Sequence, residues 1–223
     1  MTTTLWTQHA PLRHPYGLPS NAPVTSPWGP VQDARTHLVS TGPEFPEGCW
    51  IVETSSHGGL YLTPAINEQV PEPLRKDSGW YEEDCEIAIP LACLPDLFRG
   101  TKSQAQCEQI VKSWFPHEWM TWRGRQLREG ESYCYDIELQ QLESMRRGTY
   151  LTMAAWGDWH AAVPPGYVVV HARVGGRHVR ASRKPNGYFL VPASHYSATA
   201  PRSFEITPGE YEELDDFDMN AGR

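Results

Sequence analysis

The densest group of residues that can do chemistry lies at positions 79–86, where four carboxylates fall within five positions. The rings of Trp80 and Tyr81 precede the acids Glu82, Glu83 and Asp84. Carboxylates bind divalent metal ions, act as general bases and contact protein partners. If the segment opens a helix, the same acids only complement the positive end of the helix dipole. Three consecutive side chains cannot all face one way, so both interpretations stay open.

A second candidate is the segment Ser-Ser-His-Gly-Gly at 55–59, which joins two predicted strands. Its paired glycines and the imidazole of His57 can bring backbone N–H groups and a base close to a ligand. No nucleophile-elbow or phosphate-loop pattern surrounds it. A tight turn therefore explains the same residues.

A third candidate follows a predicted strand, where Asp158 and His160 are separated by one residue in Trp-Gly-Asp-Trp-His. A loop held by a sheet often carries site residues, and an acid can orient an imidazole. A surface turn anchored by two buried indoles is the alternative. Cys85 can also be drawn as a nucleophile with His57 or His160 as its base. Core filling by this cysteine is the competing interpretation.

The five cysteines are odd in number and contain no C-x-x-C pair, so the sequence indicates neither a disulfide framework nor a zinc knuckle. We expect reduced cysteines, no bound metal and no cofactor. The chain carries 27 acidic and 19 basic residues, for a net charge of -8. This dilute acidity argues against both a DNA mimic and a dedicated nucleic-acid binder, because binding phosphates usually needs a concentrated basic surface.

One basic concentration exists, around the pair Gly175-Gly176, where a hairpin is predicted. A β-ribbon bearing these side chains can touch phosphates, although a solvated hairpin explains them too. Its residues are Arg173, Arg177, Arg180, Arg183 and Lys184.

The elements that must position these candidates are short, since twenty prolines interrupt the chain. We expect an irregular Pro-rich arm over 1–25, a single α+β domain over 26–214 and an acidic disordered tail over 215–223. The domain should combine antiparallel sheets with a few packed helices. Strands are predicted at 31–40, 49–55, 59–62, 150–155, 166–174, 178–181, 187–191 and 204–206. Helices are predicted at 103–115, capped by Ser103 and stopped by Pro116, at 133–147 before Gly148, and at 208–214.

The N-terminal residues lack the features of a secretory signal, and no apolar run is long enough to span a bilayer. We therefore expect a cytoplasmic protein with no membrane partner. The oligomeric state cannot be predicted.

Four of these segments together resemble an uncharacterised domain family of plasmids, integrated elements and phages. They are Ser-Pro-Trp-Gly-Pro at 26–30, Ser-His-Gly-Gly at 56–59, Gly-Trp-Tyr-Glu-Glu-Asp-Cys-Glu at 79–86 and Trp-Gly-Asp-Trp-His at 156–160. The resemblance covers about 26–214, and the acidic block is its most specific part. It implies an accessory protein of mobile DNA but no particular reaction.

The leading prediction is a phage or plasmid accessory protein that binds a host protein and inhibits a defence system such as CRISPR or restriction. The expected partner is a defence nuclease or effector. The alternative is an enzyme that acts on a small molecule or nucleotide, using His57, the acids at 82–84 and Asp158 with His160 in one cleft. A second alternative is DNA binding through the basic hairpin at 173–184.

Overall fold

A computed structural model describes residues 18, 21–36, 45–99, 103–197 and 202–221. The chain divides into two compact units, Met1–Gln126 and Leu127–Arg223, and each is described by itself. The predicted arm over 1–25 lies largely outside the described residues. No helix among the residues described has both the length and the apolar character needed to cross a bilayer.

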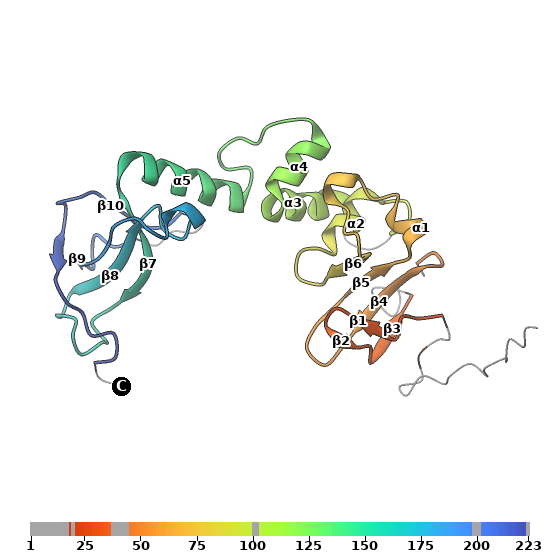
Figure 1. Cartoon of the computed structure of the whole chain (residues 1–223), viewed down its shortest axis with the longest axis horizontal. Coiled ribbons are helices and arrows are strands. Elements are labelled where there is room, and N and C mark those ends of the chain that lie inside the picture. The colour runs from red at the N-terminus through yellow and green to blue at the C-terminus, as the bar shows by residue number, and fades with distance from the viewer. Residues whose placement is uncertain (1–17, 19–20, 37–44, 100–102, 198–201, 222–223) are drawn as a thin grey trace, which may run out of the picture. The chain divides into compact units, whose positions relative to one another are not determined.

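The first unit contains a four-stranded antiparallel sheet in which each strand pairs with the next along the chain (Figure 1). Its strands are β3 (Asp33–Arg35), β4 (Cys49–Glu53), β5 (Gly58–Leu62) and β6 (Trp80–Glu82), and a small hairpin of β1 (Thr25–Ser26) and β2 (Gly29–Pro30) precedes them. The predicted meander of strands near 31–40, 49–55 and 59–62 is confirmed in the described residues. The interpretation of 79–86 as the start of a helix is wrong, because β6 pairs with β5 as an edge strand.

Five helical segments lie in the part of the first unit that the structure describes. They are α1 (Pro64–Asn67), the 3-10 helix η1 (Glu72–Leu74), α2 (Ala88–Cys93), α3 (Gln104–Trp114) and α4 (Pro116–Arg123). Ser103 caps α3 as predicted, within a capping box completed by Gln106. Pro116 ends α3 but also begins α4, because a proline in the first turn of a helix has no backbone hydrogen bond to lose.

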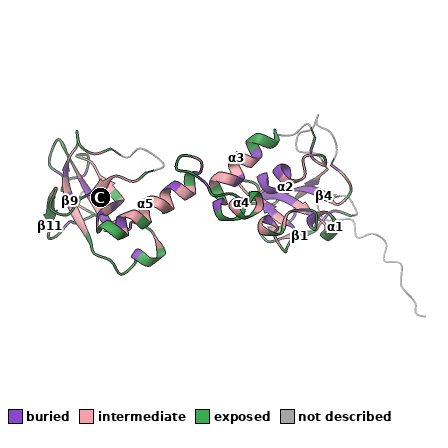
Figure 2. Ribbon diagram, turned by 90° about the horizontal axis from the view of Figure 1, so that it is seen from above, coloured by how far each residue is buried: buried purple, intermediate pink, exposed green. Residues whose placement is uncertain are grey.

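The core of this unit covers both faces of the sheet. The four residues from Cys49 to Val52 are all buried, although neighbouring side chains of a strand point to opposite faces (Figure 2). Trp50 and Val52 pack with Val31 and Ala34 on one face. Ile51 shares a cavity on the other face with Leu91 of α2. The sheet is therefore a rigid support for the loops at its ends.

The second unit is a five-stranded antiparallel sheet with one long helix. The strand order is β10-β7-β8-β9-β11. The elements are α5 (Tyr133–Arg147), β7 (Tyr150–Trp156), β8 (Tyr167–Val174), η2 (Val179–Ala181), β9 (Asn186–Pro192), β10 (Glu205–Ile206) and β11 (Glu212–Leu214). The predicted α5 and the four strands β7 to β10 are confirmed, and so is the α+β fold class with antiparallel sheets and packed helices.

Two local predictions in the second unit are wrong. The expected strand at 178–181 is the 3-10 helix η2, because Gly175 and Gly176 both adopt positive φ and the His178 ring accepts a hydrogen bond from the Arg180 N–H. The expected helix at 208–214 contains β11 instead, since Glu212–Leu214 pairs with Tyr188–Leu190 of β9. Residues 215–221, in the predicted tail, are described, and Phe217 is buried against Trp156.

Candidate functional site

The turn between β4 and β5 presents His57, and the side chain of Thr54 closes that turn. Thr54 Oγ1 accepts the N–H groups of Ser56 at 3.3 Å and His57 at 3.1 Å, and it donates to the carbonyl of His57 at 2.8 Å. The turn predicted at 55–59 is therefore real, and it holds the backbone of His57 in place. About half of the His57 side chain is exposed.

Strand pairing brings Glu82 to this histidine. Gly59 lies opposite Glu82 in the β5–β6 register, so the end of β6 reaches the turn that carries His57. The Nδ1 atom of His57 lies 3.7 Å from Oε1 of Glu82. The other oxygen, Oε2, accepts the backbone N–H of Asp84 at 2.8 Å. One oxygen is thus tied to the chain while the other faces the imidazole.

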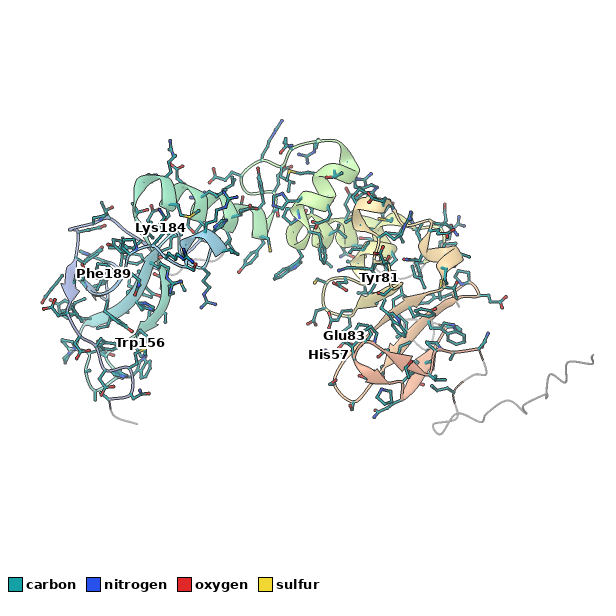
Figure 3. The ribbon with its side chains drawn as sticks, viewed as in Figure 1. His57, Tyr81, Glu83, Trp156, Lys184 and Phe189 are labelled. Carbon is teal, nitrogen blue, oxygen red and sulfur yellow. The ribbon has the colours of Figure 1, made fainter. Side chains whose placement is uncertain are left out.

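Glu83 reaches the same place over Gly58, and Figure 3 shows His57 and Glu83 side by side at the end of the sheet. The backbone N–H of Glu83 donates to the carbonyl of Gly58 at 3.1 Å. A Cβ atom on Gly58 would lie 2.4 Å from the Glu83 carboxylate. The absence of a side chain at Gly58 is what allows this carboxylate to lie here.

One ligand atom from each of His57, Glu82 and Glu83 lies within 4.8 Å of the other two. An imidazole nitrogen with two carboxylate oxygens is a donor set that divalent cations accept. The partial exposure of the cluster leaves room for water to complete the coordination.

A cavity of about 260 Å³ adjoins the cluster, and Glu83 lines it. Its apolar surface includes Ile51 of β4 and Leu91 of α2. Ile87, which immediately precedes α2, also contributes. Its charged lining includes Arg35, which pairs with Asp33 at 3.0 Å and also with Glu53. No local sequence pattern reveals Arg35, Glu53 or this cavity, because only strand pairing brings β3, β4 and Glu83 together.

Trp80 and Tyr81 position this site from inside the fold. The ring of Trp80 lies 4.5 Å from that of Tyr61 and 5.8 Å from that of Trp28. Tyr81 is fully buried, its hydroxyl donates to Asn67 Oδ1 at 2.6 Å, and burial raises its pKa to about 12. Both rings belong to the packing that holds β6 at the edge of the sheet.

The other two acidic residues of the segment at 79–86, Asp84 and Glu86, are not part of the cluster with His57. Glu86 pairs with Lys76 at 2.5 Å and accepts the N–H of Glu82 at 3.3 Å. Asp84 is exposed, and its backbone N–H holds Glu82. Burial and then the nearby Glu86 and Glu82 raise the pKa of Cys85, which keeps its thiol protonated at neutral pH. A thiolate nucleophile at Cys85 is therefore disfavoured.

Asp158 and His160 lie in the second unit, so the structure does not place them with His57. His160 is buried, its Nδ1 accepts the N–H of Ala162 at 3.3 Å, and its Nε2 donates to the carbonyl of Met219 at 3.3 Å. Both nitrogens of this ring are occupied within the fold, and the ring packs against Phe217. Asp158 is exposed. The segment is a surface turn, but the prediction that two buried indoles anchor it is wrong, because Trp159 is 75% exposed and Trp156 is only partly buried.

The basic residues at 173–184 also lie in the second unit, in β8 and the connection from β8 to β9 that contains η2. Arg177 donates to the carbonyl of Met153 at 3.0 Å, and Arg173 is partly buried in β8. Arg180, Arg183 and Lys184 are exposed, and Figure 3 labels Lys184 on this unit. DNA binding by this segment stays a prediction, which salt-sensitive retention on duplex DNA would test.

Comparison with known proteins places the chain in a family. The model of a family described as a domain of unknown function, DUF7007, matches residues 21–144, more than half of the 223-residue chain. No curated protein and no solved structure matches the chain. The match includes His57, Glu82 and Glu83, and it ends before the segment at 156–160. The chain belongs to the DUF7007 family.

Proposed function

We propose that the first unit binds a divalent metal ion through His57, Glu82 and Glu83 and uses it to hold a small ligand. The observation that carries the proposal is the convergence of three ligand atoms within 4.8 Å of one another. Metal–ligand bonds of about 2.0–2.2 Å place neighbouring ligand atoms roughly 3–4 Å apart. Small rotations of the three side chains would shorten the separations of up to 4.8 Å to the roughly 3–4 Å that a bound metal ion requires.

The donor set indicates which metals suit the site. One nitrogen and two oxygens without sulfur favour Mn²⁺, Fe²⁺, Co²⁺ or Zn²⁺ over soft ions such as Cu⁺. Three protein ligands leave coordination positions open, the arrangement that catalytic metal sites use. An open metal ion beside a cavity is competent for metal-assisted hydrolysis, because it lowers the pKa of a bound water. This site supports the alternative of an enzyme that acts on a small molecule or nucleotide over the alternative of DNA binding through the hairpin at 173–184.

Titration calorimetry with Mn²⁺ and with Zn²⁺ on the full chain tests the proposal. We expect one site per chain, and we expect His57→Ala and Glu83→Gln each to weaken it at least about tenfold, because each removes a ligand. Asp84→Asn is the matched control, since it neutralises the adjacent exposed acid and keeps the backbone N–H that holds Glu82. Equal binding by all four proteins, or no binding by the native chain, would refute the metal site.

A second candidate function rests on Trp159, whose side chain is 75% exposed. The turn that carries it is fixed, because the N–H of His160 donates to the carbonyl of Gly157 at 3.0 Å and the indole lies against Gly157. Tryptophan is the residue most enriched at the energetic centres of protein interfaces. This ring supports the function expected from the sequence, an accessory protein of mobile DNA that inhibits host defence by binding one of its proteins.

Phage plating on hosts that carry a restriction or a CRISPR system tests this second function. Expression of the chain should raise the plating efficiency of a targeted phage, and Trp159→Ala should abolish the rise. Trp114→Ala, a change at a half-exposed indole in the first unit, should leave the rise intact. Unchanged plating on every defended host, or full protection by Trp159→Ala, would contradict it.

A further inference from the structure

The cavity beside Glu83 limits the ligand to a small one. A cavity of 150 Å³ accommodates benzene, so the 260 Å³ available here suits a ligand of about ten non-hydrogen atoms. Nucleotides are several times larger than benzene. A nucleotide is therefore a poor fit, and the size favours a metabolite-sized molecule.

The walls of the cavity combine apolar side chains with the carboxylate of Glu83. Ile51 and Leu91 are buried and Ile87 is half-buried, and these three form an apolar surface. Glu83 also lines the cavity, and it belongs to the cluster with His57 as well. A ligand that fills the cavity would pack its hydrocarbon part against the two isoleucines and the leucine. Its polar head would lie near Glu83, at the proposed metal site.

The charged residues around the cavity bear on the charge that the polar head of the ligand carries. Among the described residues around the cavity, Asp33, Glu53 and Glu83 outnumber the one cation, Arg35, which is already paired with the first two. An anion is repelled from this set of side chains while no metal is bound. A divalent cation held by His57, Glu82 and Glu83 offsets the charge of those two carboxylates and offers open coordination positions to an anionic oxygen. Anion binding should therefore depend on the metal.

We infer that the ligand is a small amphipathic anion, a short-chain carboxylate or phosphate monoester. Its oxygen coordinates the metal ion, and its alkyl chain lies on Ile51, Ile87 and Leu91. This inference rests on the proposed metal function and adds the chemical class of the ligand. The apolar side chains of the cavity favour the alkyl chain of the ligand, and the open coordination positions of the metal favour its anionic head.

The test titrates acetate, butanoate and hexanoate into the full chain loaded with Mn²⁺, with Mn²⁺ occupancy followed by electron paramagnetic resonance. Affinity should rise about fourfold for each added methylene that enters the cavity, and it should vanish without Mn²⁺. Hexylamine, with the same chain and a cationic head, should not bind. Butyl phosphate compared with butanoate identifies the preferred head.

Two variants separate the cavity from the rest of the unit. Ile87→Gln places an amide in the apolar wall and should remove the dependence on chain length while Mn²⁺ still binds. Ile66→Gln changes a half-buried isoleucine outside that wall and should retain the dependence. Bound Mn²⁺ with alkanoate affinities independent of chain length overturns the inference and leaves the metal site standing. Absence of Mn²⁺ binding overturns both.

Discussion

Gly58 and Gly59 are the residues that let separate segments of the first unit meet. A Cβ atom on Gly59 would lie 2.4 Å from the ring of Trp28 and 2.3 Å from the carbonyl oxygen of Tyr81. A Cβ atom on Gly58 would approach the Glu83 carboxylate most closely, at 2.4 Å. One glycine therefore permits packing, and the other permits the candidate site.

This difference predicts opposite effects of two similar substitutions. Gly59→Ala should lower the free energy of unfolding by about 1–3 kcal/mol, because a ring and a backbone group must both shift. Gly58→Ala should cost less stability, since the flexible end of Glu83 can move, but it should weaken Mn²⁺ binding. Urea denaturation and calorimetry on both variants check this. The reverse pattern, with Gly58→Ala the less stable protein and Gly59→Ala the weaker binder, would be inconsistent with the geometry.

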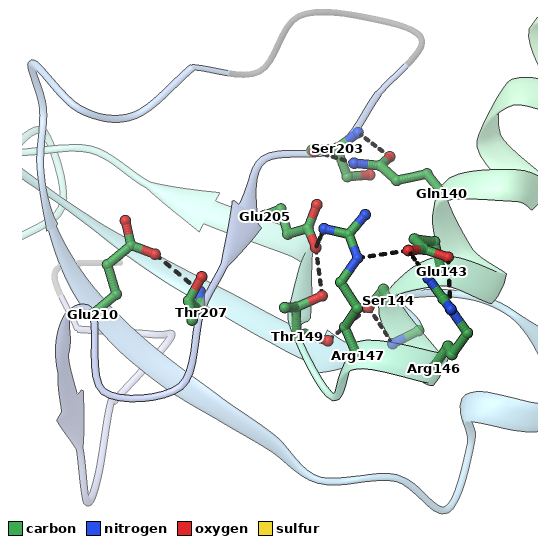
Figure 4. Close-up of polar contacts among 11 residues, drawn as sticks. Gln140, Glu143, Ser144, Arg146, Arg147, Thr149, Ser203, Glu205, Thr207 and Glu210 are labelled. Carbon is green, nitrogen blue, oxygen red and sulfur yellow. Dashed lines mark hydrogen bonds and ion pairs between the residues drawn. The ribbon is translucent and has the colours of Figure 1, made fainter. Parts of the chain in front are cut away.

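Glu143 on α5 provides a pH-dependent contact in the second unit, shown in Figure 4. Hydrogen bonds from Arg146 and then Arg147 lower the pKa of Glu143 from 4.5 to about 2. Because the folded pKa is the lower one, the stabilisation is complete above the unfolded value and is lost as the pH falls from 4.5 to 2. Exposure and salt screening keep this contribution small.

The corresponding variant is Glu143→Gln, which removes the titrating group. We expect its melting temperature to fall less steeply than that of the native chain between pH 4.5 and 2, with the difference shrinking at high salt. Thermal unfolding in low-salt buffers measures both slopes. Identical slopes in this window would show that the contact does not contribute.

The edge strand β6 depends on a buried polar contact within the first unit. The Tyr81 hydroxyl donates to Asn67 Oδ1, and Asn67 Nδ2 donates to the carbonyl of Lys76 at 2.7 Å. Tyr81→Phe removes the hydroxyl and leaves a buried amide oxygen without its donor, at a cost of about 1–3 kcal/mol. Chemical denaturation measures the cost, with the partly exposed Tyr61→Phe on β5 as control. A cost for Tyr81→Phe no larger than for the control would contradict this role.

Elements with a strong local signal could be predicted from the sequence. The apolar spacing near 133–147 predicts α5 and Gly148 predicts its end, and the run of β-forming residues at 49–55 predicts β4. The strands β6 and β11 could not be predicted, because β6 is only three residues long and runs into an acidic segment, β11 contains two glutamates, and each is determined by its pairing with another strand. Local patterns do not reveal such pairing.

The candidate site shows the same limit. The sequence singled out His57 and the acids at 82–84, since their residue types carry the chemistry. It grouped them with Asp158 and His160, whereas the structure joins His57 to Glu82 and Glu83 within one unit and occupies both ring nitrogens of His160 elsewhere. The β5–β6 register determines which of these residues meet, and the sequence of a single segment does not contain that information.

The whole molecule consists of two compact units with separate cores. Val52 belongs to a buried cluster of the first unit and Val170 to one of the second, and both are fully buried. The sequence predicts a single domain over 26–214, and that prediction can be tested by asking whether the two cores unfold together. Separate cores lead us to expect two thermal transitions in the full chain.

Matched core variants test that expectation. Val52→Ala should lower only one transition in differential scanning calorimetry, and Val170→Ala only the other, by roughly 4–8 °C for each kcal/mol lost. Each variant serves as the control for the other. A single transition shifted by both substitutions would instead support one cooperative domain over 26–214.

The ligands of the bound metal test the central claim most directly. X-ray absorption spectroscopy of the full chain loaded with one equivalent of Zn²⁺ should show nitrogen and oxygen at about 2.0–2.2 Å with the scattering pattern of one imidazole. That imidazole signal should disappear in His57→Ala. Sulfur at about 2.3 Å would assign the metal to cysteines and contradict the site, as would an imidazole signal that survives in His57→Ala.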